Sequence, residues 1–518
     1  MTVALLGPRI DALRAYATEF DLGTVGGLDQ ITERGMTALA LAKEMANEYA
    51  LRYPQWLFLD SYYYGNPPLP RDPHRLTDKY REMLQMSRSN WIGLVVNVVN
   101  ERLRIKSIRS TSNPVQDKKA WSWWTANNMD GVAPQVHSAA LRYGLCYLSV
   151  WPREGRPPKM MGESPLTCHV RFDAETDEAT AALRVWQDNV EGVLYGDLTL
   201  ADYQFHLVCT DVIMDPLSYD GYALPHRAVT ADLTNVDWQF RLYGPRPPVE
   251  RNPLGFVPYT RILTDPDLTG TYRGEIEGLI PLADRIHKTT FDRLMAQAFA
   301  SFPRAWITGI DVPKDPATGK PREPFDAAVD RLWTIESENA KVGQLDPAEL
   351  DGYIRANTAD IQALATQSRV PPSYFMAGMG VFPSGESVKA TEFGLSQKVG
   401  GRKQSYGDGW DEHLRKTAIA AGNSRLANDD GLHVTWDDVE ARSEGEMVDA
   451  LIKMGSLGVP WPALWQRWGA STEEVDAWTR LMEENAARAS QALSQVTATP
   501  QVDALIRQAP GLGIDVTA

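Results

Sequence analysis

A chain of 518 residues is long enough for several domains with a sizeable core. Its net charge of −15 argues against a protein that binds DNA tightly, because such proteins carry a basic surface, but the charge is compatible with DNA that must slide past the chain. Three cysteines without CxxC spacing argue against a disulfide framework or a zinc site, and no uncharged apolar stretch reaches the roughly 18 residues of a membrane-spanning helix.

The first half of the chain predicts an α+β region. Apolar residues at helical spacing predict a helix over 37–64, and a second helix is expected to begin at a capping signal formed by Ser89 or Asn90 and to reach Leu103. A further helix leads into a strand at 146–150. From about 165 to 262, alternating apolar and polar residues predict short strands in antiparallel hairpins.

Two long helices separated by a small insert follow. Apolar stripes place these helices at 273–300 and 346–370. The second opens with Asp346–Pro347, a capping residue followed by a proline at the first helical position. The insert has strand-like segments at 303–310 and 330–337, on either side of a polar loop.

The loop after the second long helix is unusually apolar. Loops are generally polar, because they face water. This one contains Phe375, Met376, Met379, Val381 and Phe382. These side chains are therefore expected either to pack within the protein or to contact a partner.

A third long helix is expected from about 386 to 421. Its glycines predict a bend or close packing against a neighbour; they are Gly400, Gly401, Gly407 and Gly409. A strand is predicted near His433, followed by two or three short helices. Few apolar anchors remain after 491, which predicts a disordered tail.

The sequence predicts no catalytic residue, cofactor or metal site. It has no GxxxxGK[ST], HExxH, GxSxG or kinase signature. The adjacent Cys168 and His169 lie in a strand-like segment and are expected to be core or surface residues. Carboxylate pairs are present, but such pairs are common on solvated helix faces.

The order of the predicted elements is more informative than any single motif. An α+β body precedes a long helix, a β insert, a second long helix, an apolar loop and a third long helix. Over residues 40–490 the chain resembles the portal (head–tail connector) protein of tailed double-stranded DNA bacteriophages, of the siphophage type. The stretches that carry the likeness are LDSYYYGNPPLP, NWIGLVVNVVNERLRIKSIR, GEIEGLIPLADRIHKTTFDRLMAQAFASFPRAWITG and LATQSRVPPSYFMAGMGVFPSGESVKATE.

The resemblance implies a mainly helical α+β portal fold. Its parts would be an N-terminal α+β wing at 1–272, stem helices at 273–300 and 346–370, a clip at 301–345, a tunnel loop at 371–385, a long bent helix and wing return at 386–440, a helical crown at 441–490 and a disordered tail at 491–518.

The resemblance also implies a non-enzymatic function. Copies of the chain would form a ring, expected to be a dodecamer, at one vertex of the virion capsid after assembly in the host cytoplasm. Double-stranded DNA would pass through the ring during packaging and ejection. The implied partners are the major capsid protein, with or without a scaffold, the terminase large subunit and a head–tail connector protein; no membrane is involved.

Three groups of site residues follow from the resemblance. The tunnel loop facing DNA would contain Met376, Gly378, Met379, Gly380, Val381, Phe382, Pro383 and Ser384. Channel cations would be Lys389, Lys398, Arg402 and Lys403, for which solvated charges or salt bridges between subunits are equally open. Clip contacts with partners would be Lys314, Asp315, Lys320 and Arg322.

Two other interpretations stay open at this point. The acidic, Trp-rich chain could be a carbohydrate-active hydrolase, which would place two carboxylates in one cleft. It could also be another ring-forming virion adaptor, which would lack the pair of stem helices around a clip.

Overall fold

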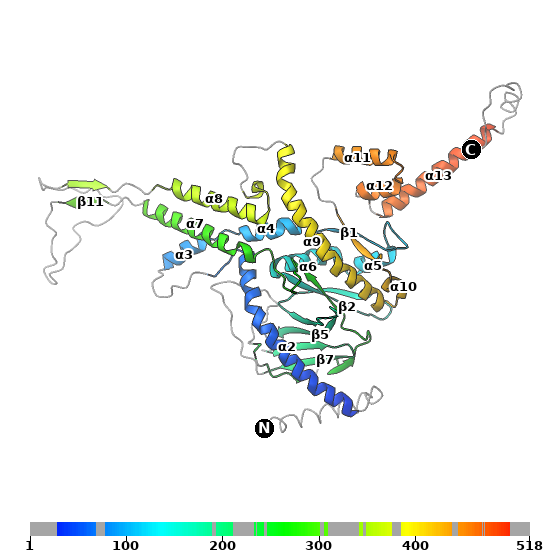
Figure 1. Cartoon of the computed structure of the whole chain (residues 1–518), viewed down its shortest axis with the longest axis horizontal. Helices are drawn as coiled ribbons and strands as arrows, with labels where there is room; N and C mark the ends of the chain where they lie inside the picture. Colours follow the sequence, from blue (N-terminus) through cyan, green and yellow to red (C-terminus); the bar gives the residue numbers. More distant parts are fainter. Residues whose placement is uncertain are drawn as a thin grey trace. The chain divides into compact units, whose positions relative to one another are not determined.

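The computed structural model describes residues 28–68, 78–188, 193–210, 233–234, 236–242, 246–300, 305–308, 341–344, 349–375, 385–437, 444–468, 470 and 472–497. The chain divides into two compact units. The first comprises Met1–Thr111 and Lys118–Asp437, and the second comprises Ser112–Asp117 and Asp438–Ala518. Helices and antiparallel sheets alternate along the chain, which confirms the predicted α+β class (Figure 1).

The N-terminal part of the first unit is helical, as predicted. Its helices are α2 (Leu28–Tyr63), α3 (Asp78–Met86), α4 (Trp91–Asn100), α5 (Lys118–Ala126) and α6 (Met129–Tyr143). The side chain of Asn90 accepts a hydrogen bond from the Gly93 N–H at 3.0 Å, so the predicted capping residue is confirmed.

The prediction that this second helix reaches Leu103 is wrong. The helix α4 ends at Asn100, and the segment beyond it forms the strand β1 (Ile105–Arg109). This strand pairs antiparallel with β13 (His433–Trp436), which lies more than 300 residues further along the chain. A partner so remote leaves no local signal, so apolar periodicity alone extended the helix too far.

Two antiparallel sheets form the centre of the first unit. One has the order β10-β2-β3, and the other contains β4 to β8 in chain order with β9 paired to β7. The bounds are β2 (Leu145–Trp151), β3 (Lys159–Glu163), β4 (Cys168–Phe172), β5 (Ala179–Asp188), β6 (Val193–Thr199), β7 (Tyr203–Cys209), β8 (Gln239–Phe240), β9 (Val249–Arg251) and β10 (Tyr259–Leu263). The predicted hairpins are therefore confirmed.

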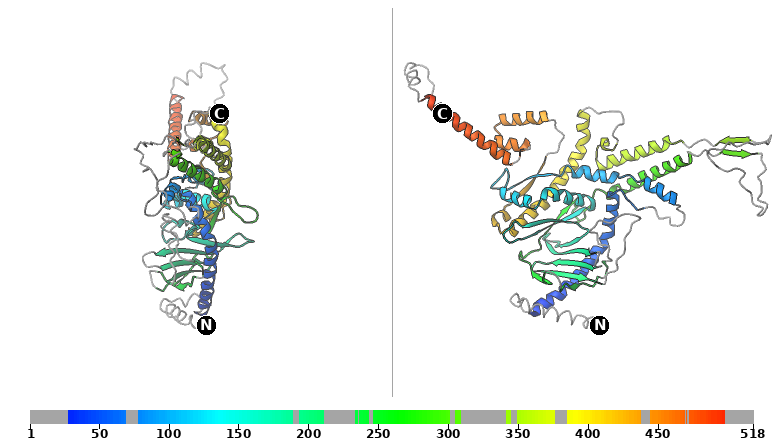
Figure 2. Two further views of the ribbon diagram at one scale, coloured as in Figure 1. Left: turned by 90° about the vertical axis from the view of Figure 1, so that its left-hand side faces the viewer. Right: turned by 180° about the vertical axis from the view of Figure 1, so that it is seen from behind.

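Two helices lead to and from a small pair of strands, as predicted. The helices α7 (Ile280–Ala300) and α8 (Asp351–Ser368) lie side by side, and the strands β11 (Ala305–Thr308) and β12 (Lys341–Gln344) join them (Figures 1 and 2). Single turns of 3-10 helix, η2 (Glu277–Leu279) and η3 (Pro372–Tyr374), precede α7 and follow α8.

Two details of this region differ from the prediction. The partner of β11 is β12, whereas the predicted strand at 330–337 lies outside the described residues. The helix α8 begins at Asp351, and the described residues before it, Glu349 and Leu350, are not helical. The capping signal at Asp346–Pro347 therefore placed the helix start several residues too early.

The third long helix, α9 (Gly385–Ala420), packs on β2 and β10 of the three-stranded sheet and on β13, and it is followed by α10 (Ser424–Ala427). Its ribbon changes direction along its length, as the glycines predicted (Figures 1 and 2). A Cβ atom at Gly409 would lie 2.7 Å from the Arg261 carbonyl oxygen and 2.5 Å from Ile262 Cδ1, whereas one at Gly400 would meet nothing within 4 Å. Close packing therefore explains Gly409 but not Gly400.

An aromatic core joins α9 to α6. The His137 ring accepts a hydrogen bond from Trp410 Nε1–H at 2.9 Å and, in the corresponding tautomer, donates through Nδ1–H to the Leu103 carbonyl at 3.1 Å. Burial lowers the pKa of His137 to about 3. His413 on α9 is also fully buried, and burial lowers its pKa to about 3. Both rings are therefore neutral in the folded protein at neutral pH.

The second unit contains α11 (Glu444–Ser456), α12 (Trp461–Trp468) and α13 (Thr472–Thr497). The Trp478 ring lies 5.4 Å from Trp465 and 6.4 Å from Trp468, measured between centroids. Helices were predicted here, but α13 is long and extends to Thr497, so residues 491–497 are helical rather than part of a disordered tail. Within the described part of the chain, no helix is long and apolar enough to span a bilayer.

Candidate functional site

The predicted site residues fall into described and undescribed parts of the chain. Residues 376–384 of the tunnel loop and the four clip residues Lys314, Asp315, Lys320 and Arg322 lie outside the described residues. Lys389 lies in α9, but its side chain is not described. Lys398, Arg402 and Lys403 are described, and the first two form a buried contact with a carboxylate beside the middle of α9.

One residue of the apolar loop packs within the chain. Phe375 is 6% exposed, and its ring centroid lies 5.8 Å from that of Trp91 on α4. For Phe375 the packing interpretation is therefore confirmed. The following residues of the loop remain predictions.

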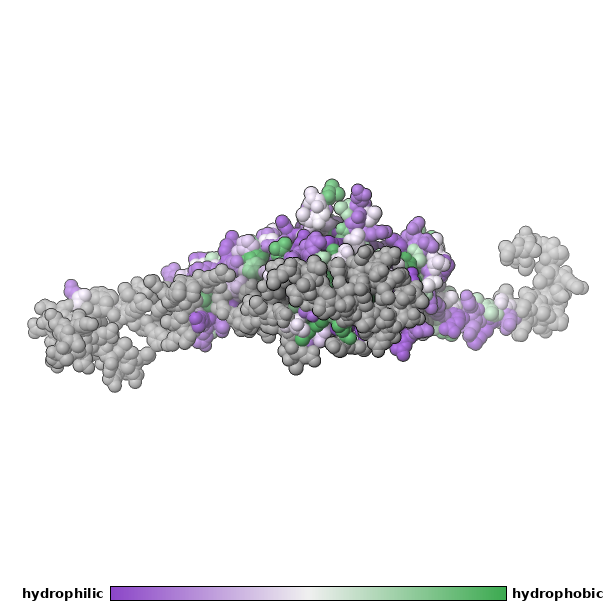
Figure 3. All heavy atoms as spheres, turned by 90° about the horizontal axis from the view of Figure 1, so that it is seen from below, coloured by the Kyte–Doolittle hydropathy of each residue, from purple (hydrophilic) through white to green (hydrophobic). Residues whose placement is uncertain are grey.

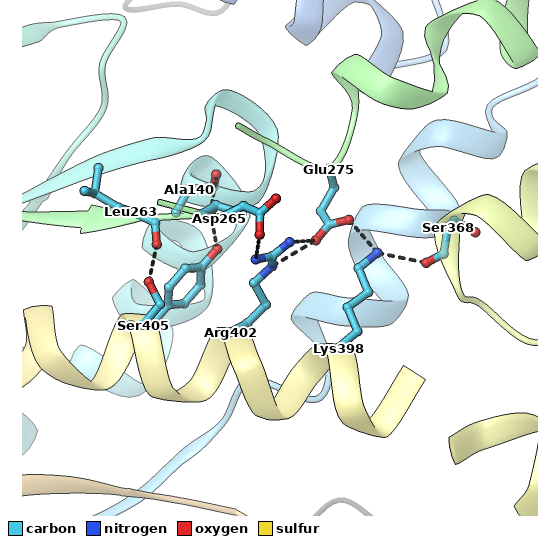
Figure 4. Close-up of polar contacts among 10 residues, drawn as sticks. Ala140, Leu263, Asp265, Glu275, Ser368, Lys398, Arg402 and Ser405 are labelled. Carbon is cyan, nitrogen blue, oxygen red and sulfur yellow. Dashed lines mark hydrogen bonds and ion pairs between the residues drawn. The ribbon is translucent and has the colours of Figure 1, made fainter. Parts of the chain in front are cut away.

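The cluster that we call the Glu275 cluster consists of Asp265, Glu275, Lys398 and Arg402 (Figure 4). The Glu275 side chain is 7% exposed, and its two carboxylate oxygens receive different cations. Lys398 Nζ forms an ion pair with Oε2, and the Arg402 guanidinium bonds Oε1 through Nε and Nη2, each at 3.0 Å. Arg402 Nη1 also contacts Asp265 Oδ1 at 3.2 Å.

The cluster joins three separate parts of the chain. Glu275 lies just before η2 and α7, and its backbone N–H donates to the Leu141 carbonyl on α6 at 2.7 Å. Lys398 lies on α9 and donates a second hydrogen bond to the Ser368 carbonyl, at the last residue of α8, at 2.8 Å. A cation at the carboxyl end of a helix also interacts favourably with the helix dipole. One lysine therefore fastens α9 both to the start of the α7 region and to the end of α8.

Hydrogen bonds continue this attachment along α9. Ser405 Oγ donates to the Leu263 carbonyl at 2.7 Å, and the Tyr406 and Thr264 hydroxyls are 2.5 Å apart. Lys403 Nζ donates to the Asp437 carbonyl at 2.6 Å. Three successive turns of α9 are thus fixed by polar contacts within the first unit.

Burial shapes the electrostatics of the cluster. Burial lowers the pKa of Lys398, and the Glu275 carboxylate opposes that change. For Arg402, burial would lower the pKa, but Glu275 and Asp265 outweigh it, so the net direction is upward. Because the Lys398 side chain is only 9% exposed, the Glu275 carboxylate favours its charged form against the effect of burial.

The prediction that Lys398 and Arg402 share one face of the helix is confirmed, because both cations contact the same carboxylate. Sequence reasoning did not find that carboxylate. Glu275 lies 123 residues before Lys398, and a lone glutamate before an apolar stripe carries no local signal of such a contact. The charges of Lys398 and Arg402 are therefore engaged within the chain, at the junction of the three helices.

The adjacent Cys168 and His169 and the other two cysteines lie in the folded part of the first unit. Cys168 is buried in the core, and the partly buried His169 Nε2 lies 3.0 Å from Glu48 Oε2, whose carboxylate also pairs with Arg171. Cys146, Cys168 and Cys209 are buried and are not joined by disulfides. Within the described ranges, no group of three His, Cys, Asp or Glu residues could hold a metal ion.

Comparison with known proteins defines the class of this chain. Residues 42–491 match the family described as "Phage portal protein, SPP1 Gp6-like". The chain belongs to this family of phage portal proteins. The family is structural rather than enzymatic, and its members are components of the virion capsid.

Two curated relatives carry the same description over most of their length. The portal protein of Mycobacterium phage L5 is 24% identical over 433 residues, which cover 79% of this chain and 81% of the relative. The portal protein of Mycobacterium phage D29 is 24% identical over 419 residues, which cover 76% of this chain and 78% of the relative.

Proposed function

We propose that copies of this chain form a closed ring of about twelve subunits at one capsid vertex and that double-stranded DNA passes through its channel during packaging and ejection. The ring meets the major capsid protein, then the terminase large subunit, and after packaging a head–tail connector protein. The terminase supplies the energy. The observation that carries the proposal is the family match over residues 42–491.

The fold of the first unit is consistent with this assignment. We assign the wing to 1–272 together with the long helix α9, the stem to the regions of α7 and α8, and the clip to 301–345, which includes β11 and β12. The crown corresponds to α11–α13. The rival interpretation as another virion adaptor is disfavoured by the pair of antiparallel helices around a two-stranded insert.

The charge of the chain suits a conduit for DNA. A net charge of −15 on each copy disfavours tight attachment to phosphates, which would stall a moving duplex. On the face drawn in Figure 3, hydrophilic residues predominate among those coloured, and hydrophobic residues form small patches. Apolar side chains at a constriction would contact DNA weakly and would not release its counterions.

We assign that constriction to the tunnel loop. Its residues Met376 to Ser384 follow Phe375, which is anchored on α4, and precede α9, which the Glu275 cluster fastens to α7 and α8. The loop is thus flanked by firmly held chain on both sides. The clip residues Lys314, Asp315, Lys320 and Arg322 are the proposed contacts with terminase and connector.

Packaging by loop variants tests the proposal. Met379→Ala and Phe382→Ala are expected to leave ring assembly intact and to reduce the DNA packaged per procapsid. Leu268→Ala is the matched control, because Leu268 is a fully exposed apolar residue in a surface turn of the first unit. Normal packaging by both loop variants would contradict a role of this loop in DNA passage.

A further inference from the structure

Arg102 lies just beyond the end of α4 and contacts residues on both sides of the tunnel loop. Its Nη2 donates to the Tyr374 hydroxyl at 2.7 Å, and the guanidinium carbon lies 5.6 Å from the centroid of the Tyr374 ring. The same Nη2 lies 3.4 Å from Glu392 Oε1 on α9. Tyr374 precedes the proposed DNA-facing residues 376–384 of the tunnel loop and Glu392 follows them, so one guanidinium reaches both flanks of that segment.

The guanidinium is itself held in place. Its Nη1 donates to the Val98 carbonyl in the last turn of α4 at 3.2 Å, and the Arg102 side chain is 15% exposed. The helix α4 is a firm support, because Val95, Val96, Val98 and Val99 are all buried. At its other end, Trp91 contacts Phe375.

We propose that Arg102 is a positioning residue that fastens Tyr374 and Glu392 to α4, so that the two flanks of the tunnel loop are held as one body. The proposal rests on the proposed function of the loop only for its consequence in DNA packaging. The planar fork of an arginine suits this task, because it offers several donors in a fixed geometry. A lysine would keep the charge but lack the fork.

Hydrogen–deuterium exchange of the assembled full-length protein tests the fastening directly. In Arg102→Met, exchange is expected to rise about tenfold both at 370–375 and at the residues around Glu392, since each flank loses a hydrogen bond to a charged group. Arg102→Lys should raise exchange at both flanks by a smaller factor. Arg104→Met is the matched control, because Arg104 is an exposed arginine two residues away.

A second pair of variants separates coupling from two independent local contacts. Glu392→Gln should raise exchange at 370–375, to which it is linked through Arg102, and Tyr374→Phe should raise exchange around Glu392. Combining either with Arg102→Met should add little to the effect of Arg102→Met alone. Effects confined to the flank that carries each substitution would overturn the proposal, as would unchanged exchange at either flank in both Arg102 variants.

DNA packaging by the same rings separates the fastening by Arg102 from the proposed function of the loop. We expect Arg102→Met rings to assemble and to package less DNA than Arg104→Met rings. If exchange rises at both flanks and packaging is normal, the fastening stands and the proposed function of the loop fails. If exchange is unchanged, the fastening fails whatever the packaging result.

Discussion

Removing the carboxylate of Glu275 should destabilise the protein far more than removing an exposed one. In Glu275→Gln, Lys398 and Arg402 stay buried while the anion that both of them contact is lost. Breaking a buried ion pair in this way costs about 3–5 kcal/mol, and we expect the lower end of that range because Ser368 and Asp265 remain as partners.

Urea unfolding followed by tryptophan fluorescence, at one fixed protein concentration, measures this loss. The matched control is Asp292→Asn, which removes an exposed pair with Lys288 on α7 and should change the free energy of unfolding by less than about 0.5 kcal/mol. Adding Lys398→Met to Glu275→Gln should recover about 1 kcal/mol or more, because an apolar side chain tolerates the buried position better than an unpaired ammonium.

The pH dependence supplies a second check on the same variant. Burial already lowers the pKa of Lys398, and loss of Glu275 removes the charge that opposes this change. The unfolded chain then holds the Lys398 proton at a pH where the folded variant has released it, so the stability of the variant rises with pH. Its deficit relative to the wild type should therefore shrink as the pH rises from 7 towards 10. If Glu275→Gln lowers the free energy of unfolding by less than about 1 kcal/mol at pH 7, the reasoning is refuted.

Two further predictions concern α9. Gly409→Ala should destabilise the protein by about 1–3 kcal/mol, because its Cβ meets the backbone at Arg261, whereas Gly400→Ala should be neutral or stabilising by up to about 1 kcal/mol; equal effects in thermal unfolding would count against the packing argument. For each histidine whose pKa burial lowers from 6.5 to about 3, stability is present above pH 6.5 and falls by about 1.4 kcal/mol per pH unit as the pH drops towards 3. His413→Leu should remove the part of this pH dependence that comes from His413 and leave the part from His137. If the slope of unfolding free energy against pH is unchanged between pH 6.5 and 3, His413 does not titrate in this way.

Much of the secondary structure could be predicted from the sequence because it depends on local patterns of residues. Asn90 marks the start of α4 as a capping residue, and alternation around Leu198 and Phe205 marks the strands β6 and β7. The glycines of α9 predicted a bend or close packing; the helix changes direction, and Gly409 is closely packed.

What the sequence did not predict depends on contacts between remote residues. The strand β1 exists because β13 lies beside it, and apolar residues up to Leu103 imitate a longer helix. The spacing of Lys398 and Arg402 places them on one face of the helix. Only the folded chain brings Glu275 into contact with both of them. The contact of Arg102 with Tyr374 and Glu392 likewise spans more than 270 residues.

The oligomeric state of the protein tests the central claim most directly. Native mass spectrometry and negative-stain electron microscopy should be applied to the 57.7 kDa chain alone and after co-expression with its capsid proteins. The account predicts a closed ring of about twelve copies with a central hole. A chain that stays monomeric under both conditions would contradict the account.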